Sequence, residues 1–242
     1  MPAFRLLDLT LSSPEENLAL DDALLDELEE RGGEPILRFW ESDQYFVVLG
    51  PSCRLLDDVH ADLCKQDGVP VLRRASGGGT VLQGPGCLSY AFVLPMTLHS
   101  DLSDIRATNR FILERIAFAL HRWEPGTDFR GISDLAINGM KISGNAQRRK
   151  RQTLLFHGTM LHAMPGDRIA RYLKQPVRQP EYRENRPHGT FLRTIDVSPK
   201  DLKDAIAAAW GAASPLDVWP ETRMAACIRR VMQRTDSDTR PT

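Results

Sequence analysis

The dipeptide Asn138-Gly139 is the feature that most narrows the folds open to this chain. Runs in which apolar and polar residues alternate flank it on both sides, and both of its residues tolerate the positive φ angles of a two-residue turn. The pattern therefore predicts a tight antiparallel hairpin with Lys141 on its second strand. Regular strand alternation would place Lys141 and Ser143 on one face of that strand and Ile142 on the other.

The rest of the sequence predicts short strands and several helices. Capping boxes predict helices that begin at Ser13-Pro14 and at Ser198-Pro199, and an amphipathic segment with Ile105 in its apolar stripe predicts a helix capped by Ser103. Because hairpins outnumber strand–helix–strand units, we expect an α+β fold with mixed, mainly antiparallel sheets and helices packed outside. The expected strands are 36–40, 45–49, 69–73, 79–82, 88–94 and 154–161, and further helices are expected at about 167–173 and 220–233.

Length and composition fit a globular protein. The 242 residues, 42% of them hydrophobic and 26% charged, are enough for one domain with a substantial core. We expect a single catalytic domain over residues 1–234 and a disordered polar tail at 235–242. The four cysteines form no C-x-x-C pair, which opposes a zinc site and a disulfide framework.

Charge and hydropathy exclude two classes of partner. The formal net charge of −1 argues against a dedicated nucleic-acid-binding protein. No apolar run is long enough to span a membrane, and the N-terminus lacks the apolar core of a signal peptide. We therefore expect a cytoplasmic protein that binds neither nucleic acid nor membrane.

Three consecutive glycines, Gly77–Gly79, follow a short apolar strand and the pair Arg73-Arg74. A turn without side chains lets the backbone approach a ligand and direct N–H groups at it, while the arginines add positive charge and Ser76 adds a hydroxyl. The segment indicates a site for a carboxylate, a phosphate or both. A plain glycine-rich loop with two solvated arginines is the alternative, and the spacing fits neither the P-loop nor the dinucleotide-binding fingerprint.

Three segments resemble motifs of the lipoate–protein ligase A family, in the biotin/lipoate ligase and octanoyltransferase superfamily. They read Arg73-Arg-x-Ser-Gly-Gly-Gly-x-Val, Asp134-Leu-x-x-x-Gly-x-Lys-Ile-Ser-Gly-Asn-Ala-Gln and His157-Gly-Thr-x-Leu. They keep the family's order and spacing. The resemblance extends to Asn17–Asp21 and to the loop Tyr182–Leu192, so it covers roughly residues 5–215, and the superfamily's catalytic-domain fold agrees with the expected α+β class.

The resemblance implies a reaction in two steps. ATP, with Mg²⁺ neutralising its phosphates, converts lipoate or octanoate to an acyl-adenylate, and a lysine of a lipoyl carrier domain then displaces AMP. Lys141 matches the family's active-site lysine, a compact cation that stabilises charge on the carbonyl and phosphate oxygens. The implied partners are the carrier domains of a 2-oxoacid dehydrogenase E2 or the glycine-cleavage H protein, with a separate accessory-domain protein in some systems; no residue is assigned to a metal.

The same resemblance implies a set of residues around the acyl-adenylate. For two of them a structural role stays open. His157 could be a hydrogen-bonded strand histidine, and Asp134 could be a carboxylate that only orients the hairpin. Lys141 considered alone is also compatible with an edge-strand lysine that discourages aggregation. The implied binding residues are Arg74, Ser76, Gly77, Gly78, Gly79, Asp134, Gly144, Asn145, His157, Gly158 and Thr159, and the two open cases are His157 and Asp134.

Departures from the ligase pattern leave the activity open. Gln83 stands where ligases often have histidine, Ser133 where asparagine is usual and Cys53 where glutamine is usual. The first alternative is an octanoyltransferase, which moves an acyl group from acyl carrier protein or between lipoyl domains with a cysteine nucleophile and without ATP. Neither the loop 124–133 nor the stretch directly after the His-Gly motif holds such a cysteine, and Cys87 has an apolar context that indicates core packing. A non-enzymatic carrier-binding paralogue is the second alternative, which the intact lysine and glycine motifs oppose.

Four consecutive cations, Arg148-Arg149-Lys150-Arg151, connect the Lys141 strand to the His157 strand. They are expected either to form a solvated hairpin tip or to dock the acceptor domain or cover the nucleotide.

Overall fold

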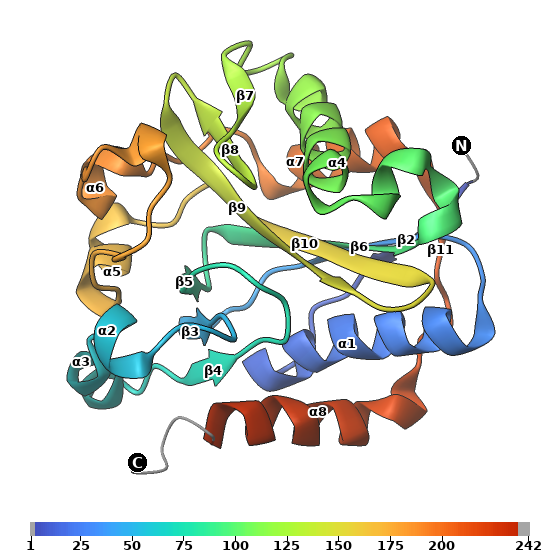
Figure 1. Cartoon of the computed structure of the whole chain (residues 1–242), viewed down its shortest axis with the longest axis horizontal. Helices are drawn as coiled ribbons and strands as arrows, with labels where there is room; N and C mark the ends of the chain where they lie inside the picture. The colour runs from blue at the N-terminus through green and yellow to red at the C-terminus, as the bar shows by residue number, and fades with distance from the viewer. Residues whose placement is uncertain (1–2, 237–242) are drawn as a thin grey trace.

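An eight-stranded sheet and a three-stranded sheet form the framework of the computed structural model, which describes residues 3–236 (Figure 1). In the large sheet the strand order is β11-β1-β2-β6-β10-β9-β8-β7. Strand β1 pairs in parallel with β2 and β11, and the other pairings are antiparallel. The expected α+β class with mixed, mainly antiparallel sheets is confirmed. The strands are β1 Phe4–Asp8, β2 Ile36–Trp40, β6 Cys87–Pro95, β7 Thr127–Arg130, β8 Asp134–Ile137, β9 Met140–Arg149, β10 Thr153–Leu161 and β11 Ala212–Pro215.

The small sheet carries the glycine loop. Its order is β4-β3-β5, with β3 (Phe46–Leu49) in the centre, parallel to β4 (Val71–Arg73) and antiparallel to β5 (Val81–Gln83). The segment Gly77–Gly79 lies between β4 and β5. Strand β4 is therefore an edge strand, and the loop that leaves it depends on contacts from outside the sheet.

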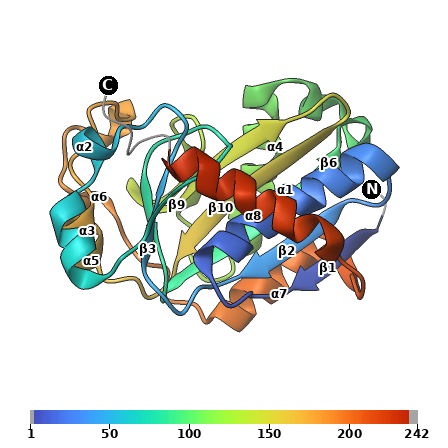
Figure 2. The same cartoon turned by 90° about the horizontal axis from the view of Figure 1, so that it is seen from below.

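Helices cover both faces of the large sheet (Figure 1). Helix α1 (Pro14–Arg31) packs on one face, and α4 (Ile105–Leu120) and α7 (Pro199–Trp210) pack on the other. Helix α8 (Glu221–Asp236) lies along the outer side of α1, as the view from below shows (Figure 2). Among residues 3–236, no helix is both long and apolar enough to cross a lipid bilayer. The short helices gather beside the small sheet: α2 Leu55–Asp58, α3 Ala61–Asp67, α5 Gly166–Tyr172 and α6 His188–Phe191.

Strand β6 shows why the sequence reads as continuously apolar in this region. Ala91 and Val93 pack into the cluster under α1, whereas Tyr90, Phe92 and Leu94 pack under α4 and α7. A strand that is covered on both faces has no polar face to alternate with. The strand is buried from its first residue to its eighth.

Local signals predict most helices and the central hairpin correctly. The hydroxyl of Ser13 accepts a hydrogen bond from the Glu16 N–H, and the Glu16 carboxylate accepts one from the Ser13 N–H at 3.0 Å, so the capping box of α1 is confirmed. Asn138 and Gly139 have φ angles of 52° and 75°, which confirms the predicted turn between β8 and β9.

Two expected boundaries are wrong. Helix α4 is capped by Asp104 rather than Ser103, because the Asp104 carboxylate accepts from the N–H groups of Arg106 and Ala107 at 2.8 Å; Ile105 is consequently 53% exposed and lies outside the apolar stripe. Residues 235 and 236, expected to begin a disordered tail, continue α8, since the Thr235 hydroxyl donates to the Val231 carbonyl at 3.0 Å. The remainder of that tail, 237–242, lies outside the described residues.

A fully buried arginine joins the large sheet to α1. The guanidinium of Arg38 on β2 donates to the Asp21 carboxylate at 2.6 Å, to the main-chain and side-chain oxygens of Asn17 at 2.8 Å, and to the Leu9 carbonyl at 3.1 Å. Burial alone would raise the pKa of Asp21, but Arg38 and His157 outweigh it and hold that pKa below its usual range. The strand, the helix and the segment before the helix therefore share one cation.

Replacing this cation should destabilise the fold strongly. Arg38→Met keeps the apolar volume but leaves the Asp21 charge buried without its arginine partner, so the free energy of unfolding at pH 7 should fall by about 3–5 kcal/mol. Urea denaturation measures the change. Because the folded-state pKa of Asp21 is lowered, the pair stabilises the fold above the unfolded pKa of about 3.9, and the difference should shrink as the pH falls through the lower folded value.

Lys200→Ala is the control, because it breaks an exposed pair with Asp204 on α7. It should leave the unfolding curve unchanged. A loss below about 1 kcal/mol for Arg38→Met would show that the buried pair does not hold the helix to the sheet.

Candidate active site

The side chain of Arg74 braces the glycine loop from inside. Its Nη2 donates to the carbonyls of Gly77 at 2.6 Å and Gly79 at 2.8 Å, and its Nη1 donates to the Val48 carbonyl at 3.2 Å. Burial lowers the pKa of Arg74 to about 10, so it remains a cation at neutral pH. No carboxylate of residues 3–236 forms an ion pair with it. A buried cation with only carbonyl partners favours an anion beside the loop.

The three glycines differ in what surrounds them. Gly78 has a φ of 90°, and a Cβ there would lie 3.0 Å from Arg74 Nη2 and 3.8 Å from the Cβ of Ala146 on β9. A Cβ on Gly77 or Gly79 would meet no atom within 4 Å. Gly78 is thus the position where the loop is packed, and its neighbours border open space.

A second chain of contacts fixes Ser76. Its hydroxyl lies 2.5 Å from Nε2 of His157, and Nδ1 of the same imidazole lies 3.3 Å from the Asp21 carboxylate that Arg38 holds. Because a carboxylate only accepts, Nδ1 donates to Asp21, and Nε2 shares a hydrogen bond with the Ser76 hydroxyl. His157 therefore connects the start of the glycine loop to the buried ion pair of α1.

Lys141 forms a pair with Asp134 at the mouth of the hairpin. The Lys141 Nζ lies 2.7 Å from Asp134 Oδ1, and the Tyr182 hydroxyl donates to Asp134 Oδ2 at 2.7 Å. Burial and the Asp134 charge both raise the pKa of Tyr182, which keeps it protonated as a donor. The loop Tyr182–Leu192 also folds back onto this strand, because the Arg193 N–H donates to the Lys141 carbonyl at 2.9 Å.

A β-bulge decides where the lysine points. Ser143 stands opposite Leu135 and Lys141 stands opposite Ala136, so Ile142 is an extra residue in β9. The expectation that Lys141 and Ser143 share a face is therefore wrong. Ile142 packs in the core under α4, and Ser143 contacts Tyr90 of that core at 3.0 Å, whereas Lys141 turns to Asp134 on the opposite face. Bulges commonly re-aim a side chain beside an active site.

Other predicted site residues pack against one another. A Cβ on Gly144 would lie 2.9 Å from Lys141 Nζ, so this glycine makes room for the lysine, and Thr159 lies opposite Gly144 in the sheet. A Cβ on Gly158 would lie 1.8 Å from Asn145 Oδ1. The Asn145 side chain accepts from Tyr90 at 2.5 Å and donates to the Ser133 carbonyl at 2.9 Å, so its amide is used within the protein.

The predicted residues thus form two groups on one face of the large sheet. Arg74, Ser76, Gly77–Gly79 and His157 make the first, and Asp134, Lys141 and Gly144 make the second. Gly78 connects them, since a Cβ on this glycine would point toward Ala146 and the Asn145 carbonyl of β9.

Three of the four cations of the basic turn have partners within the protein, so a solvated hairpin tip is wrong for them, whereas the docking role stays a prediction. Arg148 pairs with Asp22 at 2.7 Å, Lys150 pairs with Asp26 at 2.6 Å, and Arg149 donates to the Gln147 side chain at 2.8 Å. Strand geometry also places Arg148 roughly 23 Å along β9 from Lys141. Only Arg151 of the four extends an exposed side chain without an ion pair among the described residues.

The carboxylates of the site do not assemble a metal centre. Within residues 3–236, no group of three or more His, Cys, Asp or Glu side chains is arranged to hold a metal ion. Both oxygens of Asp134 are already engaged, by Lys141 and Tyr182. The residues present therefore do not fit a metal held by the protein alone.

Sequence reasoning misses several residues of the site. The sequence assigns no individual role in the site to Asp21, Arg38 or Tyr182. Asp21 belongs to a helix motif, Arg38 to an apolar strand and Tyr182 to a loop. Gly50 packs so closely on the glycine loop that a Cβ there would lie 2.0 Å from the Gly78 carbonyl oxygen. Cys53, in the same turn, has its Sγ 3.6 Å from that oxygen.

Residues 13–209 match the lipoyl protein ligase A/B catalytic domain. The chain belongs to this family. The match includes both groups of site residues and ends before β11 and α8.

Relatives in this family carry more than one activity in their names. The chain is 31% identical over 182 residues to a putative lipoate-protein ligase A of Aeropyrum pernix, covering 75% of the chain and 66% of the relative. It is 28% identical over 200 residues to the octanoyltransferase LipM of Carboxydothermus hydrogenoformans, covering 72% and 70%. The chain spans less than two thirds of several ligase relatives, for example 47% of the lipoate-protein ligase LplJ of Bacillus subtilis.

Solved structures of lipoate ligases share the fold. A bi-partite lipoate protein ligase of Thermoplasma acidophilum, studied with its E2 lipoyl domain, superposes with a TM-score of 0.80 at 23% identity, covering 98% of this chain and 94% of that one. A lipoate-protein ligase A bound with ATP gives a TM-score of 0.79 at 22% identity, covering 98% and 96%. At these identities the likeness shows the fold alone.

The contrast between Gly78 and Gly77 gives a matched test of the loop. Gly78→Ala imposes a strained left-handed φ and crowds Arg74, so it should lower the free energy of unfolding by about 1–2 kcal/mol. Gly77→Ala faces open space and should leave it unchanged or raise it by up to about 1 kcal/mol. Thermal and urea unfolding of both variants measure this difference, and equal effects would contradict the packed role of Gly78.

Proposed function

We propose that this protein is a lipoate–protein ligase that activates lipoate or octanoate with ATP and transfers the acyl group to a lysine of a carrier domain. The observation that carries the proposal is the bulge at Ile142, which turns Lys141 out of the core toward Asp134, on the face that also carries His157 and the glycine loop. Two cations, Lys141 and Arg74, thereby border the same face. The family match and the ATP-bound and lipoic-acid-bound relatives support the choice of substrates.

The first step would join the acyl carboxylate to the α-phosphorus. One carboxylate oxygen forms the new O–P bond while the bond to pyrophosphate breaks, and negative charge grows on the phosphoryl oxygens. Preorganised cations stabilise such charge most effectively in a partly buried site. The Lys141 ammonium would exchange part of its contact with Asp134 for the substrate oxygens, while the Tyr182 hydroxyl keeps the Asp134 carboxylate oriented.

The second step would transfer the acyl group. The carrier lysine amine attacks the carbonyl carbon, the carbonyl–oxygen bond to AMP breaks, and the amine proton is lost as the amide forms. Lys141 would stabilise the oxygen charge of the intermediate. Mg²⁺ neutralises ATP phosphates, and because residues 3–236 offer no ready metal site it would enter with the nucleotide.

The proposed partners are lipoyl carrier domains, of a 2-oxoacid dehydrogenase E2 or of the glycine-cleavage H protein, in the cytoplasm. The Thermoplasma structure, which pairs a bi-partite ligase with an E2 lipoyl domain, supports the first. Because the chain spans only part of several ligase relatives, we include an accessory-domain protein among the proposed partners.

Cys53 favours a second candidate, an octanoyltransferase that works without ATP. It is half-buried beside Gly78, whereas the other three cysteines are buried, and burial raises the pKa of Cys87 to about 12. Cys53 is therefore the cysteine best placed to form an acyl thioester. The similarity to LipM points the same way.

Lys141→Ala should abolish acyl transfer, and the chain offers a matched control. The Lys141 Nζ lies 2.7 Å from the Asp134 carboxylate, and the two side chains are 24% and 10% exposed. The Lys150 Nζ lies 2.6 Å from the Asp26 carboxylate, and these side chains are 25% and 9% exposed. Lys141→Ala and Lys150→Ala should therefore lower the melting temperature by similar amounts. Only Lys141→Ala should lose carrier modification, by at least about a hundredfold, in a gel-shift or mass assay of the carrier. Near-normal turnover of Lys141→Ala would refute the assigned role.

Pyrophosphate exchange separates the two activities. The ligase should exchange labelled pyrophosphate into ATP only when lipoate or octanoate is present, and Cys53→Ser should retain this exchange and carrier modification. If modification instead requires an acyl thioester donor, stops with Cys53→Ser and leaves an acyl adduct on the parent protein by mass spectrometry, the transferase is the activity. Binding of a carrier without either reaction would indicate the non-enzymatic paralogue.

A further inference from the structure

Helix α8 lies outside the residues that match the family, yet it contacts the strand that leads into the glycine loop. The Arg73 N–H donates to the Thr235 hydroxyl at 3.1 Å, and the Arg234 Nε donates to the Arg73 carbonyl at 3.3 Å. Both main-chain polar groups of one β4 residue are therefore bonded to consecutive residues of α8. Because β4 is an edge strand, the small sheet does not supply these partners.

The two arginines beside this contact brace the two loops of the site. The Arg73 guanidinium donates to the carbonyls of Gly50 and Cys53, and the Arg74 guanidinium donates to those of Gly77 and Gly79. The Gly50 turn and the glycine loop in turn nearly touch. A shift of the backbone at Arg73 would therefore move both loops together.

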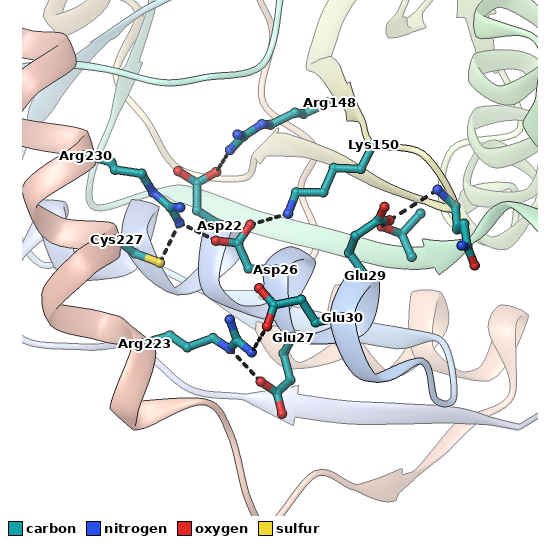
Figure 3. A network of polar contacts seen from close by, with 12 residues as sticks. Asp22, Asp26, Glu27, Glu29, Glu30, Arg148, Lys150, Arg223, Cys227 and Arg230 are labelled. Carbon is teal, nitrogen blue, oxygen red and sulfur yellow. Dashed lines mark hydrogen bonds and ion pairs between the residues drawn. The ribbon is translucent and has the colours of Figure 1, made fainter.

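Helix α8 is itself held at a fixed place on α1. Asp26 of α1 lies between Lys150 on one side and Arg230 of α8 on the other, and Arg223 reaches Glu27 and Glu30 (Figure 3). Asp22 in the same way accepts from Arg148 at 2.7 Å and from Arg234 at 2.7 Å.

These pairs leave the end of α8 little freedom. Cys227 and Val231 of α8 are buried in one cluster with Leu72 of β4. The end of the helix that meets Arg73 is therefore fixed by both charge and packing.

We infer that α8 is a positioning element for the active site, and that Thr235 and Arg234 act through the Arg73 backbone to set the glycine loop. This deepens the proposed function, because the loop is the one assigned to the acyl and phosphate groups. Thr235 and Arg234 are positioning residues, since their partner is Arg73 and not a substrate.

The test compares the two ends of α8. Thr235→Val keeps the side-chain shape and removes the hydroxyl that accepts from Arg73, and Thr235→Ser restores it. Arg223→Ala is the control, because it breaks two charged contacts between α8 and α1 at the other end of the helix. Hydrogen exchange followed by mass spectrometry reports the peptide that covers residues 74–79, and steady-state kinetics report KM and kcat for lipoate.

Loss of this hydrogen bond should speed exchange in residues 74–79 and raise KM for lipoate by about threefold to tenfold in Thr235→Val, with kcat changed by less than about twofold. Thr235→Ser should return both values to those of the parent. Arg223→Ala should lower the melting temperature without changing either.

Equal exchange in Thr235→Val and the parent, or equal effects of Thr235→Val and Arg223→Ala on the loop, would overturn the inference. Hydrogen exchange of residues 74–79 can be measured whether or not the protein turns over a substrate. Parent protein that lacks pyrophosphate exchange but shows the expected protection pattern would therefore contradict the ligase proposal and leave the positioning role of α8 in place.

Discussion

The buried ion pair between Arg38 and Asp21 is the contact on which the site depends. It fixes α1 against β2, and through His157 it also sets the Ser76 hydroxyl at the start of the glycine loop. An uncompensated charge at this depth is too costly to tolerate, so both partners and their neighbours must keep one geometry. The position of α1 relative to the glycine loop is thereby fixed by contacts in the core, away from solvent.

Charge is used in the same way along the rest of α1. Asp22 and Asp26, one helical turn apart, each pair with one cation from the end of β9 or the turn after it and with another from α8. The acidic face of this helix is therefore an internal surface. The site itself differs, because Arg74 is buried against carbonyls and has no carboxylate partner among the described residues, which leaves its charge for a ligand.

The features that sequence predicts correctly are those that short-range forces decide. The Asn138-Gly139 turn and the Ser13 cap involve residues within one turn of each other, and their outcome does not depend on distant partners. The direction of Lys141 could not be predicted, because the bulge at Ile142 arises from pairing with β8. The expectation of a solvated tip at the basic turn is wrong for Arg148, because its partner lies 126 positions away in the sequence. Strands β1, β7 and β11 are not predicted from the sequence. Strands β7 and β11 are the two edges of the large sheet and bury one residue each, so no apolar pattern marks them.

The parallel pairing of β1 with β11 has a consequence for how the protein is made. Strand β1 is synthesised before β11, and its outer edge stays open until β11 has also emerged. Pairing between segments so distant in sequence is slow, and an open edge invites wrong association in the meantime. Helix α8 follows β11, so the contact with Arg73 forms after the rest of the sheet. A nascent chain would then hold a nearly complete framework before its glycine loop is fixed.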